Sequence, residues 1–284
     1  MEIRNNVDLG KYTTFHIGGN ARNFYMPEST QELISCLRTL GNEKDFYILS
    51  GGSNLLINDK KIYDNVIYCK RLNDYIIDLG EGKYHVGAAV RIQKLINKLN
   101  RDGYGGIEYL YSLPALVGGI VVMNAGRGEG YAKSISDFIE RVYIVRGGEE
   151  LTVEKGDCGF GFRTSVFKGS KDIVVAVDLR MEVTDSKNAE LDIRRRMAEV
   201  KLYQERNKAN FGSVFSCCNP RIMNIMQKLS YGRKSGVHYS SKTPNWLVNE
   251  GKGTYKQAKH LIDDVAALHK IFKKECKVEV QIWD

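Results

Sequence analysis

The sequence predicts an α+β fold in two parts, a larger amino-terminal part and a smaller carboxy-terminal part. Segments with apolar residues at the i, i+3, i+4 and i+7 positions, typical of helices, alternate with short apolar segments typical of strands. A Gly-Gly pair at 147–148 joins two of these strands as a hairpin. The polar stretch at 184–188 marks the boundary between the parts. We therefore expect one domain at 1–184, with lobes at 1–60 and 61–184, and a second at 189–284.

The first lobe is predicted to be a small β-α-β unit. A strand is expected at 21–26, and Ser29 with Glu32 forms a capping box that opens a helix. The helix ends near Gly41, and a second strand follows at 46–50.

The larger lobe mixes strands with one strongly amphipathic helix. Ile92, Leu95, Ile96 and Leu99 have the spacing of a single buried helix face. Strands are expected at 66–69, 75–78, 84–87, 141–146, 149–153 and 172–183.

The second part begins with a charged helix that runs to about Glu205. A helix opened by Pro220 is expected to bury Ile222, Ile225, Met226 and Leu229. Another helix begins at Thr254 and buries Ala258, Leu261, Ile262, Val265 and Leu268. The last strand alternates, so that Val278, Val280 and Ile282 face the core and Glu279 faces away from it.

Two glycine-containing segments indicate an anionic ligand. In the first, an apolar strand runs into Gly51, Gly52, Ser53 and Asn54, where backbone N–H groups can converge on an anion. By itself such a glycine pair is more often a tight turn. The second segment, 112–126, interrupts an apolar run with small residues and could alternatively be a buried strand. Two such loops in one chain favour a large anionic cofactor.

Neither of two common phosphate-binding motifs is present. No Gly-x-Gly-x-x-Gly follows a strand, and the segment at 236–243 differs from a P-loop because Ser241 occupies the second glycine position. The formal net charge of +8 suits either nucleic acid or a phosphorylated small molecule. The basic run at 194–196 lies on an expected helix, where a solvated face is the usual explanation.

Composition narrows the class of protein. With 43% hydrophobic and 27% charged residues, the chain has the composition of an ordinary globular protein. It lacks an apolar stretch of about 18 residues and a signal-peptide core after Met1, so we expect a cytoplasmic protein. Its six cysteines show no Cys-x-x-Cys, and Cys217 and Cys218 are adjacent, so free thiols are expected. The histidines lack ligand spacing, so we expect no metal.

Several short motifs follow one another in the order found in a known family. They span nearly the whole chain and occur at 12–19, 51–54, 106–109, 117–119, 123–126, 162–165, 212–215, 245–249 and Glu279. The chain thereby resembles the UDP-N-acetylenolpyruvoylglucosamine reductases, also called UDP-N-acetylmuramate dehydrogenases, which are flavoenzymes of bacterial peptidoglycan synthesis.

The resemblance implies an FAD-binding domain of the vanillyl-alcohol-oxidase (PCMH) type followed by a smaller α+β substrate-binding domain. It implies noncovalent FAD, NADPH as reductant and a nucleotide-sugar substrate, with no nucleic acid, membrane or obligate protein partner. The implied substrate-binding residues are Asn219 and Asn245. The implied cofactor-binding residues are Thr14, Gly51, Gly52, Ser53, Asn54, Leu55, Pro114, Gly118, Gly119, Asn124 and Gly126.

Three matched polar residues carry the chemistry that the family performs. Hydride addition to the enolpyruvyl double bond builds negative charge on the adjacent carboxylate, which a cation such as Arg163 stabilises. By family match Glu279 assists, and Ser213 donates the proton that completes the reaction. Without the resemblance, Arg163 would be interpreted as a residue that pairs with a surface carboxylate, and Ser213 as a turn residue.

The chain departs from the family pattern mainly in the second part. Ala115 and Leu116 replace the usual Gly-Thr after Pro114, and Phe162 replaces a tyrosine. The segment at 215–220 is two residues longer than the family's Phe-Lys-Asn-Pro and lacks the lysine, and Thr243-Pro244 replaces His-Ala. Two alternatives therefore stay open: a divergent flavoenzyme with another substrate, and a non-catalytic protein that binds anions or nucleic acid.

Overall fold

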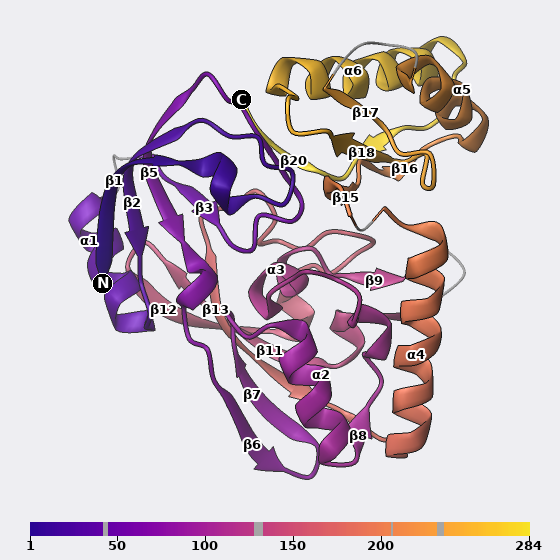
Figure 1. The fold of residues 1–284 in the computed structure, drawn as a ribbon. Helices are drawn as coiled ribbons and strands as arrows, with labels where there is room; N and C mark the ends of the chain where they lie inside the picture. The colour runs from indigo at the N-terminus through magenta and orange to yellow at the C-terminus, as the bar shows by residue number, and fades with distance from the viewer. Residues whose placement is uncertain (42–44, 128–132, 206, 232–235) are drawn as a thin grey trace. The chain divides into compact units, whose positions relative to one another are not determined.

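The computed structural model of this chain describes residues 1–41, 45–127, 133–205, 207–231 and 236–284. Contacts divide it into two compact units (Figure 1). The first unit comprises Met1–Asn5, Asn23–Gly51 and Asp64–Val200. The second comprises Asn6–Arg22, Gly52–Tyr63 and Lys201–Asp284.

These units differ from the predicted domains in two places. The polar stretch at 184–188 is not a linker, because helix α4 (Ser186–Tyr203) begins within it and belongs to the first unit as far as Val200. Two amino-terminal segments group with the second unit by contacts. The assignment of cofactor and substrate domains stays a prediction.

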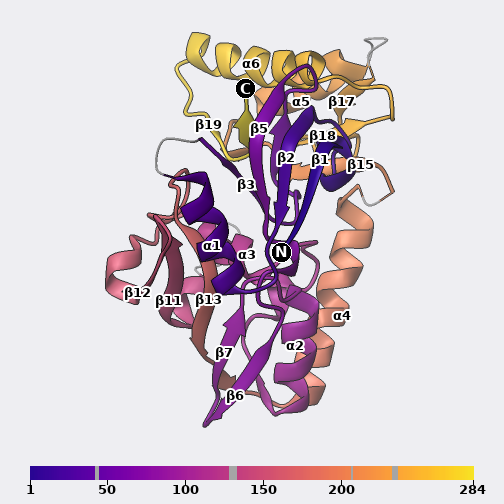
Figure 2. The same cartoon turned by 90° about the vertical axis from the view of Figure 1, so that its left-hand side faces the viewer.

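The first unit contains a five-stranded antiparallel sheet (Figure 2). Gly147 and Gly148 have φ of 58° and 82°, and Arg146 pairs with Glu149, which confirms the two-residue hairpin. The expected strand at 172–183 is interrupted at Met181, and its last residues pair separately as β14 (Glu182–Val183) with β8 (Tyr104–Gly105). The sheet order is β12 (Glu149–Glu154), β11 (Ile139–Arg146), β13 (Ile173–Arg180), β7 (Lys83–Gly87) and β6 (Ile76–Gly80).

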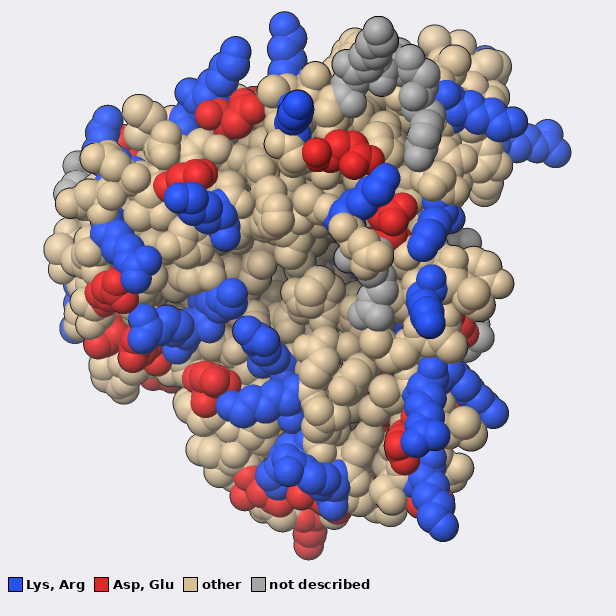
Figure 3. Space-filling view, viewed as in Figure 1, with Lys and Arg blue, Asp and Glu red and all other residues tan. Residues whose placement is uncertain are grey.

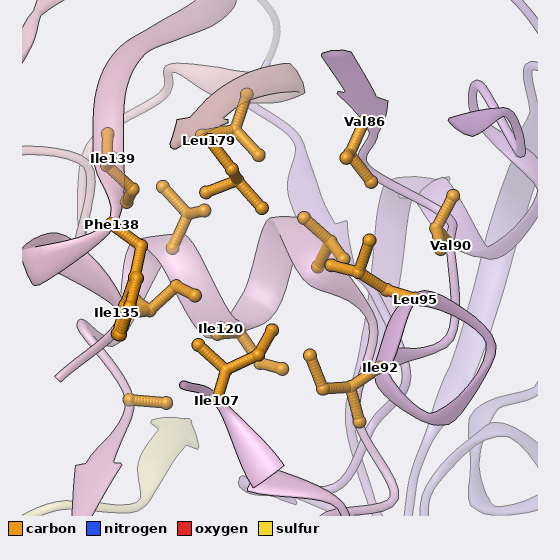
Figure 4. Close-up of a cluster of buried hydrophobic side chains, with 14 of the residues drawn as sticks. Val86, Val90, Ile92, Leu95, Ile107, Ile120, Ile135, Phe138, Ile139 and Leu179 are labelled. Carbon is orange, nitrogen blue, oxygen red and sulfur yellow. The ribbon is translucent and has the colours of Figure 1, made fainter. Parts of the chain in front are cut away.

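Helices contribute to the apolar cores of this unit. α1 (Thr30–Leu40) buries Leu33 and Leu37 against Val145 and Ile173 of the sheet. α2 (Ile92–Arg101) buries its four predicted apolar residues in a second core. The short α3 (Val117–Val122) lies in the middle of that core (Figure 4). The glycine-containing second segment is therefore fixed by packing around it.

The expected amino-terminal β-α-β unit is modified by an inserted strand. The sheet order is β1 (Glu2–Asp8), β2 (Asn20–Met26), β5 (Ile62–Tyr68) and β3 (Tyr47–Leu49), so β5 separates the two strands joined by α1. The capping box is half formed. The Glu32 N–H donates to Ser29 Oγ, but the Glu32 carboxylate accepts from Glu28 N–H instead of Ser29.

The second unit has a three-stranded antiparallel sheet, β15 (Ala209–Ser213), β18 (Trp246–Asn249) and β17 (Val237–Tyr239). Helices α5 (Pro220–Tyr231) and α6 (Tyr255–Ile271) share its apolar core. The predicted inward face of α5 is partly wrong. Ile225 and Leu229 are 54% and 55% exposed, while Met223 is buried beside Ile222 and Met226, so the buried stripe is narrower than the spacing suggested.

The carboxy-terminal segment forms two short strands instead of one. β19 (Lys277–Val278) pairs antiparallel with β16 (Phe215–Cys217), and β20 (Gln281–Trp283) pairs parallel with β4 (Leu55–Ile57). The predicted alternation is confirmed, because Val278, Val280 and Ile282 all contact the core of the second unit. Short 3-10 helices occur at Leu9–Tyr12, Cys69–Arg71, Glu108–Leu110, Ile135–Asp137 and Lys155–Cys158.

Candidate active site

Gly51 of the first glycine-containing segment lies beside the second segment, and both belong to the first unit. A Cβ placed on Gly51 would lie 3.6 Å from the Pro114 carbonyl oxygen, and one on Gly119 would lie 3.7 Å from Ser50 Oγ. Both are ordinary van der Waals distances. The packing of the chain therefore does not itself require glycine at 51 or 119, and the missing side chains leave the backbone accessible to a ligand.

Gly52 has a different reason to be glycine. Its φ is 63°, and a Cβ would lie 2.1 Å from the Tyr12 carbonyl oxygen within the second unit. Thr14 N–H donates to the Gly52 carbonyl at 3.0 Å, and Thr14 Oγ1 donates to the Asn210 carbonyl at 2.6 Å. Thr14 and Gly52 thus fix the backbone just before residues 53–55. Ser53 and Asn54 are half-buried, and Leu55 is buried in β4.

Hydrogen bonds from the protein hold the second glycine-containing segment (112–126) in place. Val117 and Gly118 N–H groups donate to the Val90 and Ala88 carbonyls, each at 2.9 Å, and a Cβ on Gly118 would lie 3.0 Å from Ala88 Cβ. Gln93 Nε2 donates to the carbonyls of residues 111 and 113 at 2.7 and 2.6 Å, just before the exposed Pro114. Sequence reasoning missed Gln93, because nothing in the helical pattern shows which backbone an exposed-face glutamine will meet.

Asn124 connects this segment to the turn that carries Arg163. Its side chain is buried, and Asn124 Nδ2 donates to the Gly161 carbonyl at 2.9 Å, while Oδ1 accepts from Ser136 N–H at 3.2 Å. Both ends of the amide are therefore engaged by the protein. Gly126 lies in β9 (Gly126–Arg127), where a Cβ would lie 2.6 Å from the Lys133 carbonyl oxygen of β10 (Lys133–Ser134).

Arg163 lies at the tip of a tight turn in the first unit. Gly161 and Thr164 exchange two backbone hydrogen bonds of 3.1 and 3.3 Å around Phe162 and Arg163. Arg163 has φ of 57°, a left-handed conformation that costs free energy for a residue with a Cβ. The turn is braced by Asn124 and by Ser165 Oγ, which donates to the Val122 carbonyl at 2.7 Å.

Ser213 and Glu279 belong to neighbouring stretches of the second unit. Ser213 ends β15, and the Glu279 N–H donates at 2.8 Å to the carbonyl of Val214, the next residue. Asn245 fixes the same place, because its Oδ1 accepts from Phe215 N–H at 3.0 Å and its Nδ2 donates to the Phe215 carbonyl at 2.7 Å. The structure thus brings together two of the three predicted catalytic residues. Arg163 belongs to the other unit.

Asn219 caps helix α5. Its Oδ1 accepts from Arg221 N–H at 3.0 Å, and its own N–H donates to His269 Nε2 at 2.7 Å. His269 is fully buried, and its Nδ1 lies 2.8 Å from the Val265 carbonyl oxygen. The Asn-Pro pair at 219–220 is a recognisable cap signal. His269 has no such signal, because its partner lies 50 residues away.

A charged cluster on α4 contacts both ends of the second glycine segment. Arg196 Nε donates to Ser112 Oγ at 3.1 Å, and Glu199 Oε2 accepts from Arg127 at 2.6 Å and from Arg196 at 3.3 Å. Burial lowers the pKa of Arg196, with a contribution from Arg127, and hydrogen bonding to Arg127 lowers the pKa of Glu199. The solvated face expected for 194–196 is therefore wrong for Arg196.

The rest of α4 is exposed as expected. Figure 3 shows Lys and Arg side chains along this helix, with acidic side chains between them. Arg194 pairs with Glu190, and Arg195 pairs with Asp192. No helix in the described part of the chain is long and apolar enough to cross a membrane. Among the described residues no cluster of His, Cys, Asp and Glu could hold a metal ion, and the absence of a metal stays a prediction.

Comparison with known proteins identifies the family. A UDP-N-acetylenolpyruvoylglucosamine reductase from Thermotoga maritima is 30% identical over 286 residues, covering 97% of this chain and 96% of the relative. The chain belongs to the UDP-N-acetylenolpyruvoylglucosamine reductase family. Another member, from Leptospira interrogans, is 29% identical and covers 93% of this chain and 86% of the relative.

Structural comparison confirms the predicted fold class. The crystal structure of the Thermus caldophilus reductase matches with a TM-score of 0.81 at 26% identity, and the match covers all of both chains. A family model described as an FAD binding domain matches residues 21–153. The chain is thus an α+β protein with the fold of this reductase and an FAD-binding domain.

Proposed function

We propose that this protein reduces UDP-N-acetylglucosamine enolpyruvate to UDP-N-acetylmuramate, with FAD as cofactor and NADPH as reductant. One observation in the structure supports this chemistry. Asn124, in the segment expected to border the flavin, donates a hydrogen bond to the turn that presents Arg163. The cofactor segment and the cation that the reaction needs are therefore parts of one hydrogen-bonded assembly.

The residues present fit a flavin dinucleotide. Gly51 and Gly119 leave their backbones uncovered although the chain itself would tolerate a Cβ at either position. We assign pyrophosphate binding to Gly51, Gly52, Ser53 and Asn54, with Thr14 and Leu55 supporting that stretch. The segment from Pro114 to Gly126 borders the ring system, and within it Gly118 and Asn124 act mainly by fixing its shape. The bound flavin supplies the hydride for the reaction.

The polar residues act on the charge and the proton that the reaction requires. Arg163 pairs with the substrate carboxylate, where negative charge increases as the double bond is reduced. Glu279 assists at the same carboxylate, and Ser213 Oγ–H gives a proton to the carbon next to it. Asn245 positions Ser213 by clamping the backbone of Phe215. Asn219 and Asn245 line the proposed nucleotide-sugar site.

We further propose that the enzyme works in the cytoplasm without nucleic acid, a membrane or an obligate protein partner. The purified protein should be yellow, and its oxidation of NADPH, followed at 340 nm, should accelerate when the enolpyruvyl UDP-sugar is added. A colourless protein that does not bind FAD on reconstitution refutes the proposal.

A second candidate is a flavoenzyme of this family with another substrate. It is favoured by the segment at 215–220, which is longer than the family's and carries two cysteines where a lysine is usual. Losing that lysine removes a cation that could pair with a phosphate. NADPH oxidation that does not respond to the enolpyruvyl UDP-sugar in a flavin-loaded preparation would support this candidate, and a normal response would exclude it.

A further inference from the structure

Cys218 and Cys276 occupy opposite positions at one end of an antiparallel ribbon. Strands β16 and β19 pair Phe215 with Val278 and Cys217 with Lys277. The register shifts between these two pairs, and continuing it by one residue beyond the strands places Cys218 opposite Cys276. Directly opposed residues in such a pair have Cα atoms about 4.5–5.5 Å apart, which falls inside the range that disulfides span.

The side chains of these two cysteines also point to the same face. Both Cys218 and Cys276 pack against the apolar core of the second unit. Burial raises the pKa of the Cys276 thiol to about 11, and the neighbouring Cys218 contributes to that rise, so the sulfur atoms are close enough to interact. Cys217 contributes less to that rise, and it is Cys218 that packs against this core. All six cysteines are free thiols in the structure, as predicted.

We propose that Cys218 and Cys276 form an oxidative modification site that closes as a cross-strand disulfide. The oxidant is a low-molecular-weight disulfide. One cysteine thiolate attacks it, forming a mixed disulfide and releasing one thiolate. The second cysteine then attacks the protein sulfur of the mixed disulfide and releases the other thiolate. Two protein thiols lose two electrons and two protons, and the oxidant becomes two thiols.

The position of the bond links it to the proposed chemistry. From Cys218 the chain runs back through β16 to Val214, which follows Ser213, and from Cys276 it runs forward through β19 to Glu279, whose N–H donates to the Val214 carbonyl. A disulfide at Cys218 therefore fixes one end of the ribbon whose other end carries two proposed catalytic residues. It also lies beside Asn219, the cap of α5. The inference does not depend on the proposed function, because the bond can be detected without any activity.

The rate of closure should depend strongly on pH. Burial raises the pKa of both thiols, so few thiolates exist at pH 7, and the rate should rise about tenfold per pH unit up to roughly pH 9. The titratable groups around the pair are Cys217 on β16, Tyr239 on β17 and His269 on α6. Burial, with smaller contributions from Cys276, Asp264 of α6 and Cys218, raises the pKa of Tyr239, so this phenol stays neutral in that range.

The test uses the full-length protein as purified, with its flavin. It is incubated with oxidised glutathione at pH 8.5, its remaining thiols are alkylated, and it is digested without reductant for mass spectrometry. The expected product joins the peptides that contain Cys218 and Cys276 and is two hydrogen atoms lighter than the two reduced peptides together. Dithiothreitol should reverse it. The oxidised protein should melt at least about 5 °C higher, because the bond closes a long loop.

Three serine variants separate the outcomes. Cys217→Ser should still form the bond, whereas Cys218→Ser and Cys276→Ser should not. The buried Cys36 and Cys69 should stay reduced in all samples, which controls for unfolding. A bond that involves Cys217, glutathione adducts that never resolve, or a lower melting temperature after oxidation would each overturn the proposal. Fragmentation of the wild-type cross-linked peptide shows which of the adjacent Cys217 and Cys218 carries the bond and which is alkylated, so the result stands even where a variant folds poorly.

Discussion

Gly51 and Gly52 are adjacent, yet the structure gives them different roles, which a pair of variants can separate. In Gly52→Ala the new Cβ would collide with the Tyr12 carbonyl oxygen, and the positive φ adds strain, so we expect a loss of stability of about 2 kcal/mol or more. Gly51→Ala meets only ordinary contacts, so its unfolding free energy should stay within about 0.5 kcal/mol of wild type.

Unlike the unfolding free energy, the affinity for FAD should change when Gly51 is replaced. The proposed cofactor approaches the uncovered Gly51 backbone, so Gly51→Ala should raise the dissociation constant for FAD by about tenfold or more while leaving stability of the apoprotein unchanged. Urea unfolding of the apoprotein and fluorescence titration with FAD measure the two quantities. Unchanged FAD affinity in Gly51→Ala would remove Gly51 from the proposed site.

Ser213 should affect only the second half of the reaction. Ser213→Ala removes the proposed proton donor, so NADPH should still bleach the flavin at the wild-type rate, while reoxidation by the enolpyruvyl UDP-sugar slows by about 10²–10⁴-fold. Rapid-mixing absorbance at 450 nm separates the two steps. Ser216→Ala is the matched control, since Ser216 Oγ donates to the carbonyl of the exposed Lys277, and it should reoxidise at the wild-type rate. Equal slowing of both variants would contradict the assignment.

For single residues, the sequence predicted which side chains matter but not which groups they contact. Asn124, Asn219 and Asn245 were predicted to bind cofactor or substrate, and each has side-chain atoms engaged with the protein's own backbone. Gln93 and His269 were not predicted, because their partners lie far away in sequence or outside any local motif. The partner of a polar side chain depends on tertiary packing, which local pattern does not contain.

Helix α4 is the element that fixes both ends of the proposed flavin segment. Arg196→Met removes its contacts with Ser112 and Glu199, so we expect a loss of about 1–2 kcal/mol in unfolding free energy and several-fold weaker FAD binding. Arg194→Met is the matched control, because Arg194 is 73% exposed and pairs with Glu190 of the same helix. Thermal melting and FAD titration report both effects. Equal changes in the two variants would show that α4 does not support the segment.

The Glu199 carboxylate gives this cluster a defined pH dependence. Its pKa in the folded protein is lowered from 4.5, so its stabilising effect is present above about pH 4.5 and is lost as the pH falls through the lowered value. Glu199→Gln should therefore be less stable than wild type at pH 7, and the difference should narrow below pH 4.5. Urea unfolding at several pH values measures it, and a constant difference would contradict the ion pairing.

Elements with strong periodicity were predicted well, and those that depend on distant contacts were not. The α2 face, the Gly147-Gly148 hairpin and the carboxy-terminal alternation follow from local pattern alone. The α5 face was partly wrong because the buried stripe is narrower than the spacing suggested, so that Met223 is buried while Ile225 and Leu229 are exposed. The terminal strand divides because its two halves pair with different strands, β16 and β4.

For the molecule as a whole, the sequence predicted the fold class and the family but not the division into compact units. Segments at 6–22 and 52–63 join the second unit through strand pairing and backbone contacts, such as β4 with β20 and Thr14 with Asn210. Such contacts between distant segments have no local signal, so a linear boundary could not predict them.

Transfer of hydride from NADPH through a bound flavin to an enolpyruvyl nucleotide sugar can be measured in two separate steps. The flavin-loaded protein is reduced under anaerobic conditions with one equivalent of NADPH and then mixed with UDP-N-acetylglucosamine enolpyruvate. We expect the 450 nm absorbance to return in full and one equivalent of UDP-N-acetylmuramate to form. A flavin that stays reduced, with the sugar recovered unchanged, would contradict this expectation.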